Sequence, residues 1–119
     1  FDKYTKVDRC TDLYETLINR PEVLKDALVG DKVIGRAAAF VAIVGGVSKI
    51  YALLISQPAI DLLDRYQVAY EYEELVPYIQ NRTKDGLCPM EALTMTVDEP
   101  EEAVKQIGEF IERMRQRTS

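Results

Sequence analysis

Residues 47–73 read VSKIYALLISQPAIDLLDRYQVAYEYE, and this stretch determines the expected fold class. Residues 47–55 are rich in apolar residues without clean alternation, as is typical of a strand buried on both faces of a parallel sheet. Ser56 then has the character of a helix N-cap, with Pro58 in the first turn. Residues 68–73 alternate tyrosine and glutamate, as a half-exposed strand does. A strand, a helix and a second strand in this order predict parallel neighbouring strands.

Helical patterns flank this unit on both sides. Apolar residues recur at spacings of three and four after residue 8, and Pro21 is expected to begin a short helix that Gly30 ends. Asp31 is expected to begin a long central helix, which ends at Gly45 and Gly46. Two more helices are predicted, at residues 88–93 and from about residue 100. The pattern predicts one three-layer α-β-α sandwich domain over residues 1–119.

The charge balance and the absence of histidine restrict the function. The 119-residue chain has 15 basic and 20 acidic side chains, and its net charge is −5. This balance disfavours a nucleic-acid partner, because nucleic-acid-binding domains concentrate lysine and arginine. Without histidine, the chain lacks the usual general base near neutral pH and the commonest metal ligand. Catalysis would therefore depend on carboxylates, a thiol, lysine or backbone dipoles, and no cofactor is predicted.

Cysteine usage and hydropathy indicate a cytoplasmic protein. Cys10 and Cys88 lie far apart, whereas a disulfide-stapled secreted domain has more cysteines in a shorter chain. The most apolar run, residues 33–47, contains Arg36 and is shorter than the roughly 20 apolar residues that a bilayer span requires. No signal-peptide pattern opens the sequence. We therefore expect neither a disulfide nor a membrane partner.

Cys88 at a predicted helix start is the first candidate catalytic residue. Unpaired backbone N–H groups and the helix dipole favour the thiolate there. Glu91, one turn later, would lie on the same face of the helix. In the alternative interpretation, Cys88 is a small buried apolar residue and Glu91 interacts only with the helix dipole.

Asp31 and Lys32 are the second candidate site. At a helix start they would lie beside N–H groups that are able to bind an anion, and Asp31 could assist catalysis; alternatively, Asp31 is only an N-cap. Asn81 and Arg82 lie in a polar loop that could bind a carboxylate, a phosphate or a ribose hydroxyl, or that could be a surface turn. Ser56 is included among the ligand-binding candidates, although a cap explains it better than a nucleophile.

Four ordered blocks also carry a family resemblance: DKVIGRAAA at residues 31–39, ISQPA at 55–59, VPYI with Asn81 and Arg82 at 76–82, and CPME at 88–91. They resemble the domain of unknown function 1893 family, small prokaryotic proteins with a cytidine-deaminase-like fold. The resemblance implies a central sheet between helices. It also implies that residues 1–7 are a tail or the remnant of an N-terminal hairpin, and an exposed strand there would favour a homodimer.

The resemblance does not imply zinc-dependent deaminase chemistry. Zinc deaminases place His-x-Glu or Cys-x-Glu at one helix start and Pro-Cys-x-x-Cys at another. In that layout Asp31 begins the first motif, and Val33 occupies the place of the catalytic glutamate. A metal site of Asp31, Cys88 and Glu91 would be a poor match for zinc, so no metal is predicted.

These observations predict a protein that binds a nucleotide-like small molecule through Asp31, Lys32, Ser56, Asn81, Arg82 and Cys88. One alternative is a thiol-dependent enzyme with Cys88 as the nucleophile and Asp31 or Glu91 assisting. The other is a structural or partner-binding domain.

Overall fold

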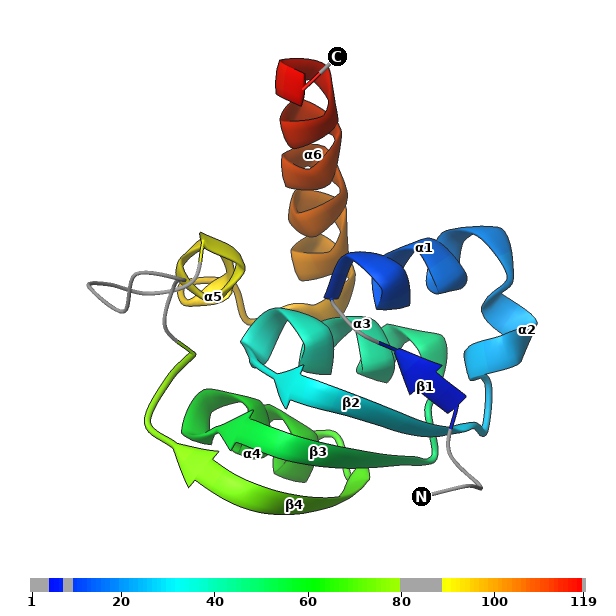
Figure 1. Cartoon of the computed structure of the whole chain (residues 1–119), viewed down its shortest axis with the longest axis vertical. Helices are drawn as coiled ribbons and strands as arrows, with labels where there is room; N and C mark the ends of the chain where they lie inside the picture. Colours follow the sequence, from blue (N-terminus) through cyan, green and yellow to red (C-terminus); the bar gives the residue numbers. More distant parts are fainter. Residues whose placement is uncertain (1–4, 8–9, 80–88, 119) are drawn as a thin grey trace.

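A parallel sheet and six helices make up the described part of the chain (Figure 1). The structure is a computed structural model. It describes the backbone of residues 5–7, 10–79 and 89–118 and the side chains of residues 13–79 and 89–116. In chain order the elements are β1 (Thr5–Val7), α1 (Cys10–Asn19), α2 (Pro21–Leu24), β2 (Leu28–Ile34), α3 (Arg36–Gly45), β3 (Lys49–Ser56), α4 (Gln57–Arg65), β4 (Ala69–Val76), α5 (Pro89–Thr94) and α6 (Pro100–Thr118).

The strands lie in the order β1-β2-β3-β4, and each pair of neighbours is parallel. The register aligns Ile34 of β2 with Ile55 of β3, and Ile55 with Leu75 of β4. The predicted strand–helix–strand unit is therefore confirmed as β3, α4 and β4. The α/β class with parallel neighbours is confirmed with it.

The helices that connect these strands lie on one face of the sheet. The strands follow one another in a single direction across the sheet, and crossovers between parallel strands are right-handed. Every connecting helix therefore lies on the same side of the sheet. Figure 1 shows α3 and α4 together behind the sheet. Helix α3 contacts α1, α4, α5 and α6, so it is the central helix of the domain. No second helical layer covers the other face among the described residues, and the three-layer sandwich stays a prediction.

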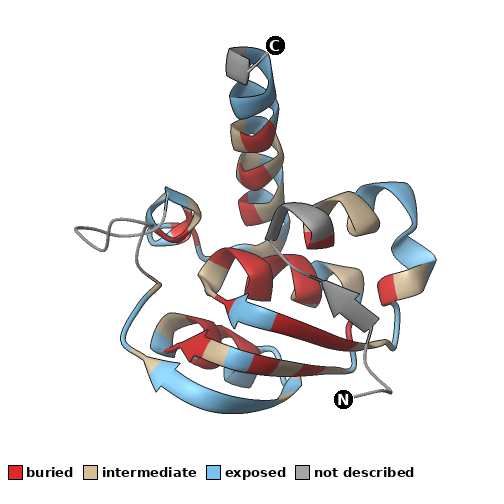
Figure 2. Cartoon of the chain, viewed as in Figure 1, coloured by how far each residue is buried: buried red, intermediate tan, exposed pale blue. Residues whose placement is uncertain are grey.

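The core lies between this face of the sheet and the helices. Figure 2 shows that buried residues concentrate on α3, on the central strands and on one side of α6. The largest fully buried apolar side chains are those of Phe40, Leu13, Leu24, Ile34, Ile50, Ile55, Leu62, Leu63 and Ile107. Burying each of these side chains contributes about 1.5–3 kcal/mol. Small residues, Ala37, Ala38 and Ala39, let the neighbouring helices approach α3 closely.

The prediction of a helix from Asp31 is wrong, because residues 28–34 form β2. Strand β2 pairs with β1 on one side and β3 on the other, and this pairing satisfies its backbone in place of helical hydrogen bonds. Gly35, which has an extended backbone, precedes α3 as its N-cap, and the helix begins at Arg36. The predicted end of the same helix is confirmed, because Gly46 adopts the left-handed conformation with φ 76°. The helix from Pro21 is likewise shorter than predicted and ends at Leu24.

Candidate functional site

The carboxyl ends of β2, β3 and β4 form the edge of the sheet where a ligand site is expected. In parallel α/β sheets, ligands bind outside the carboxyl ends of the strands. Here β2 leads through Gly35 into α3, and β3 leads directly into α4. Residues 77–79 continue from β4 along the same edge.

Glu91 is a buried carboxylate at this edge and joins two separate segments. Its side chain comes from α5, and the residue is only 2% exposed. Oε1 accepts the backbone N–H of Arg36 at 2.6 Å, and Oε2 accepts the backbone N–H of Ile79 at 2.7 Å. The negative charge therefore lies at the N-terminus of α3, where the helix dipole stabilises it. A Cβ on Gly35 would be 3.1 Å from Oε1 of Glu91, so glycine permits this close approach.

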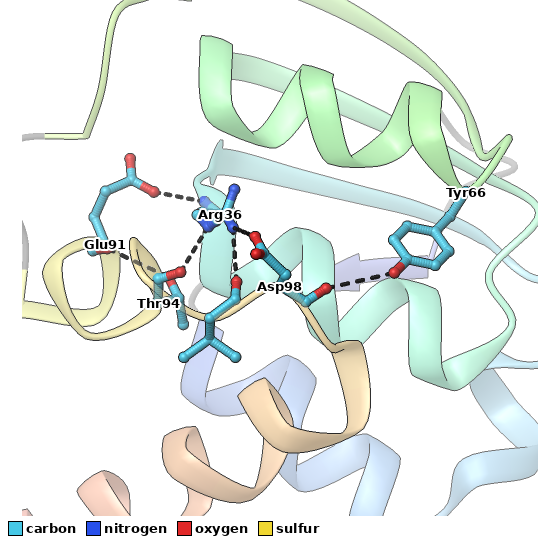
Figure 3. Close-up of polar contacts among 6 residues, drawn as sticks. Arg36, Tyr66, Glu91, Thr94 and Asp98 are labelled. Atoms are coloured by element: carbon cyan, nitrogen blue, oxygen red, sulfur yellow. Dashed lines mark hydrogen bonds and ion pairs between the residues drawn. The ribbon is translucent and has the colours of Figure 1, made fainter.

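Arg36 joins the first turn of α3 to the segment between α5 and α6 (Figure 3). Its Nε donates to the carbonyl of Thr94 at 2.6 Å, and one terminal nitrogen donates to the carbonyl of Val97 at 2.7 Å. The same nitrogen lies 3.4 Å from Oδ1 of Asp98, and the guanidinium carbon is 5.1 Å from the ring centre of Phe40. The guanidinium group thus binds the carbonyl of Thr94, the last residue of α5, and a carbonyl of the segment that follows the helix. We did not predict this role, although an arginine within an apolar run was a signal for it.

Asp31 and Lys32 do not lie at a helix N-terminus. Asp31 lies in β2 beside Ala52 of β3, and it is 2% exposed. Its Oδ1 accepts the backbone N–H of Lys32 at 2.6 Å and is 3.5 Å from that of Val33. Lys32, the next residue of β2, is exposed. The predicted anion site with exposed N–H donors beside Asp31 is therefore wrong in its geometry.

Ser56 is the N-cap of α4, as predicted. It is fully buried, and its Oγ accepts the backbone N–H of Ala59 at 3.3 Å. The next residue, Gln57, donates from its side-chain amide to Oδ1 of Asp61 at 2.9 Å. The first turn of α4 therefore presents an amide and a carboxylate side by side.

A cavity of about 530 Å³ opens next to this turn. Its walls come from the start of α4 and the end of β4, and the lining residues are Gln57, Pro58, Asp61, Leu75, Val76 and Pro77. This volume lies within the range of about 300–1,000 Å³ that is typical of small-molecule sites. The sequence analysis did not name these residues as a site. Residues 57–58 and 76–77, which belong to two of the four family-like blocks, nevertheless meet here.

Tyr70 and Asp64 face each other where α4 ends and β4 begins. The rings of Tyr70 and Tyr72 are stacked, with centres 6.3 Å apart. The pKa of Tyr70 is raised because its side chain is hydrogen-bonded to Asp64, because it is partly desolvated, and because the Asp64 charge disfavours the phenolate. This contact lies at the other end of α4 from the cavity-lining residues Gln57 and Pro58.

Cys88, Asn81 and Arg82 lie outside the described residues, so their places in this arrangement stay predictions. Within the described part of the chain, no group of three His, Cys, Asp or Glu residues could hold a metal ion. The sequence analysis considered a metal site of Asp31, Cys88 and Glu91. Its two described members, Asp31 and Glu91, already accept backbone N–H groups. Their described contacts do not form a zinc site.

The fold and this edge define an α/β protein with a parallel sheet and an open cavity at the carboxyl ends of its strands. The chain belongs to the DUF1893 (TM1506) family, a domain of unknown function, whose family model matches residues 4–111. The predicted family membership is thus confirmed.

The chain is also similar to a crystal structure of a DUF1893 family protein (TM1506) from Thermotoga maritima, at 2.70 Å resolution. The TM-score is 0.77 and the sequence identity 29%, and the match covers 83% of this chain and 67% of the other. The curated proteins contain no match to this chain. Among the described helices, none has the length and apolarity required to cross a membrane.

Proposed function

We propose that this protein binds a small nucleoside-like molecule in the cavity between the start of α4 and the end of β4. The observation that supports this proposal is the cavity itself, at the edge where parallel α/β sheets bind ligands. We include in the proposal the cytidine-deaminase-like class and its three-layer arrangement, and a cytoplasmic location based on the two widely separated cysteines.

The walls of the cavity suit a planar heterocycle. Pro58, Leu75 and Pro77 supply apolar surface against which a ring can pack. Gln57 and Asp61 lie at the polar end, and their amide and carboxylate groups can pair with the donors and acceptors on the edge of a nucleobase. Asn81 and Arg82, which follow Pro77 closely in the sequence, are proposed to bind the ribose or a phosphate of a larger ligand.

The proposed function is binding rather than catalysis. Asp61 is the one ionisable group among the described lining residues, and no described nucleophile lies beside it. Glu91 already accepts two backbone N–H groups, so its role in this structure is to hold α3 and residues 77–79 together. Neither residue has the partner that an activated nucleophile requires.

Calorimetry and thermal-shift measurements with nucleobases, nucleosides and nucleotides test the proposal. A ligand at about 100 times its Kd should stabilise the fold by about 2.7 kcal/mol. Gln57→Ala should weaken binding about tenfold or more, because it removes a group that pairs with the base edge.

Gln106→Ala is the matched control. The Gln106 amide likewise donates to a carboxylate four residues away, that of Glu102 on α6, so this change removes the same contact away from the cavity. Binding should be unchanged in this variant. If no ligand of these classes binds at millimolar concentration, or if both variants weaken binding equally, the proposal is wrong.

A further inference from the structure

The polar end of the cavity is a hydrogen-bonded pair of side chains, Gln57 and Asp61. Both residues line the cavity from the first two turns of α4, and the amide nitrogen of Gln57 donates to Oδ1 of Asp61 at 2.9 Å. A carboxylate only accepts hydrogen bonds, so the nitrogen of the amide, and not its oxygen, faces Asp61. The pair therefore has a defined orientation before any ligand binds.

This hydrogen bond determines which polar groups the pair offers to a ligand. Each carboxylate oxygen can accept two hydrogen bonds and an amide nitrogen can donate two. Oδ1 of Asp61 thus keeps one acceptor position, and Nε2 of Gln57 keeps one N–H. Oδ2 of Asp61 adds a further acceptor. Along the pair the order is Oδ2, Oδ1 and Nε2, which is acceptor, acceptor and donor.

A ring edge that matches this order must present donor, donor and acceptor. The 2-amino group, the N1–H and the neighbouring carbonyl of guanine have this order. We propose that the ligand of the cavity is a guanine nucleoside or nucleotide, whose 2-amino and N1–H groups donate to Asp61 and whose carbonyl accepts from Gln57. This inference rests on the proposed function, because it names the base that the nucleoside-binding cavity selects.

The same order of groups disfavours other rings. Hypoxanthine has no group at position 2 and loses one hydrogen bond to Asp61. Xanthine carries a carbonyl there, and its oxygen would face Oδ2 of Asp61, so that two acceptors oppose each other. Adenine presents one donor and one acceptor to the pair and makes two of the three contacts. Position 2 of a purine is therefore where the cavity discriminates most sharply.

The apolar walls strengthen this discrimination. Gln57 and Asp61 are exposed on the surface of α4, where water can satisfy them. A ring that packs against Pro58, Leu75 and Pro77 excludes water from the pair. A carboxylate oxygen that loses water must then find a donor on the ligand, and an opposing acceptor is more costly there than in open solvent.

Calorimetry with the 5′-monophosphates of guanosine, inosine and xanthosine tests the inference. These ligands share the ribose and the phosphate, and they differ at position 2, which carries an amino group, a hydrogen or an oxygen. The wild-type protein should bind guanosine monophosphate about tenfold more tightly than inosine monophosphate, because a hydrogen bond to a charged group is lost. Xanthosine monophosphate should bind most weakly.

Asp61→Asn should reverse this order. A carboxamide can keep its oxygen toward Gln57 and the N1–H of the base, and its nitrogen then donates toward position 2. The variant should therefore bind xanthosine monophosphate more tightly than guanosine monophosphate. Glu102→Gln is the matched control, because Glu102 accepts the amide of Gln106 in the corresponding pair on α6, away from the cavity. This control should keep the wild-type order, and far-UV circular dichroism confirms that both variants are folded.

The results separate this inference from the proposed function. If nucleotides bind but the wild type does not prefer guanosine monophosphate, or if Asp61→Asn keeps the wild-type order, the inference is wrong and the proposed function stands. If no nucleotide binds, both are wrong. Pterin carries the same edge on another ring system and is measured beside the nucleotides; tighter binding of pterin than of guanosine monophosphate would overturn the nucleoside as the carrier of this edge.

Discussion

Replacing Glu91 with glutamine tests whether one buried carboxylate holds the carboxyl edge of the sheet together. In the wild type, its two oxygens accept the backbone N–H groups of Arg36 and Ile79. Glutamine has nearly the same shape but only one acceptor oxygen. Its amide nitrogen must therefore face one of these two donors, which then has no acceptor from residue 91.

The expected cost follows from these two hydrogen bonds. A hydrogen bond to a charged group contributes about 1.5–3 kcal/mol, and a buried donor left without an acceptor costs about 1–3 kcal/mol. Glutamine loses one of these hydrogen bonds, weakens the other and removes the charge from the N-terminus of α3. The free energy of unfolding should therefore fall by about 3 kcal/mol. Small domains have about 5–15 kcal/mol of stability in total, so this loss is large.

Urea unfolding followed by circular dichroism measures the effect. The urea midpoint should fall with little change in the m-value, and the Tm should fall by about 12 °C. Glu112→Gln, at an exposed position on α6, makes the same chemical change outside this contact and should be neutral. If Glu91→Gln is within about 0.5 kcal/mol of the wild type, the reasoning from buried hydrogen bonds fails.

Three further changes test other contacts. Gly35→Ala should destabilise by about 1–3 kcal/mol in urea unfolding, because the new Cβ would lie 2.9 Å from Cγ1 of Ile79; wild-type stability would contradict this close approach. Gly46→Ala should cost about 1–2 kcal/mol in thermal unfolding, because φ is 76° there, and a neutral result would mean that the left-handed cap is absent. In phenolate absorbance titrations compared with Tyr70→Phe, Tyr70 should titrate above 10.0, and Asp64→Asn should lower its pKa. The raised pKa means that the folded protein holds the Tyr70 proton more tightly than the unfolded chain does. This contribution to the free energy of unfolding is therefore fully present below the unfolded-state pKa of Tyr70 and is lost as the pH rises through its folded-state pKa. A Tyr70 pKa at its ordinary value would contradict this.

Local chemistry explains which parts of the fold could be predicted from the sequence. The unit of β3, α4 and β4 has its own signals, including Ser56, whose hydroxyl accepts an N–H three residues later. Gly46 is likewise a local signal, because its backbone has a conformation that other residues avoid. These predictions needed no knowledge of the rest of the chain.

Residues 31–44 show why other boundaries could not be predicted. Their apolar side chains fit a buried helix and a buried strand equally well, and periodicity alone does not separate the two. Pairing of residues 28–34 with β1 and β3 determines the strand, and both partners are distant in the sequence. A residue considered as a helix cap, Asp31, consequently lies within a strand.

The candidate site depends on contacts that are even more distant along the chain. Glu91 was singled out for its position beside Cys88, but its main contact is Arg36, 55 residues earlier. The cavity likewise joins the first turn of α4 to the end of β4. A single sequence indicates the residue types at such a site but not which of them meet.

The exposed edge of β4 has a consequence for how the protein behaves when it is concentrated. As the last strand of the sheet among the described residues, β4 presents backbone groups to which another extended chain could add. Glu71, Glu73 and Glu74 lie along it, and an identical strand would bring like charges together. These glutamates therefore protect the protein against strand-by-strand polymerisation into fibrils.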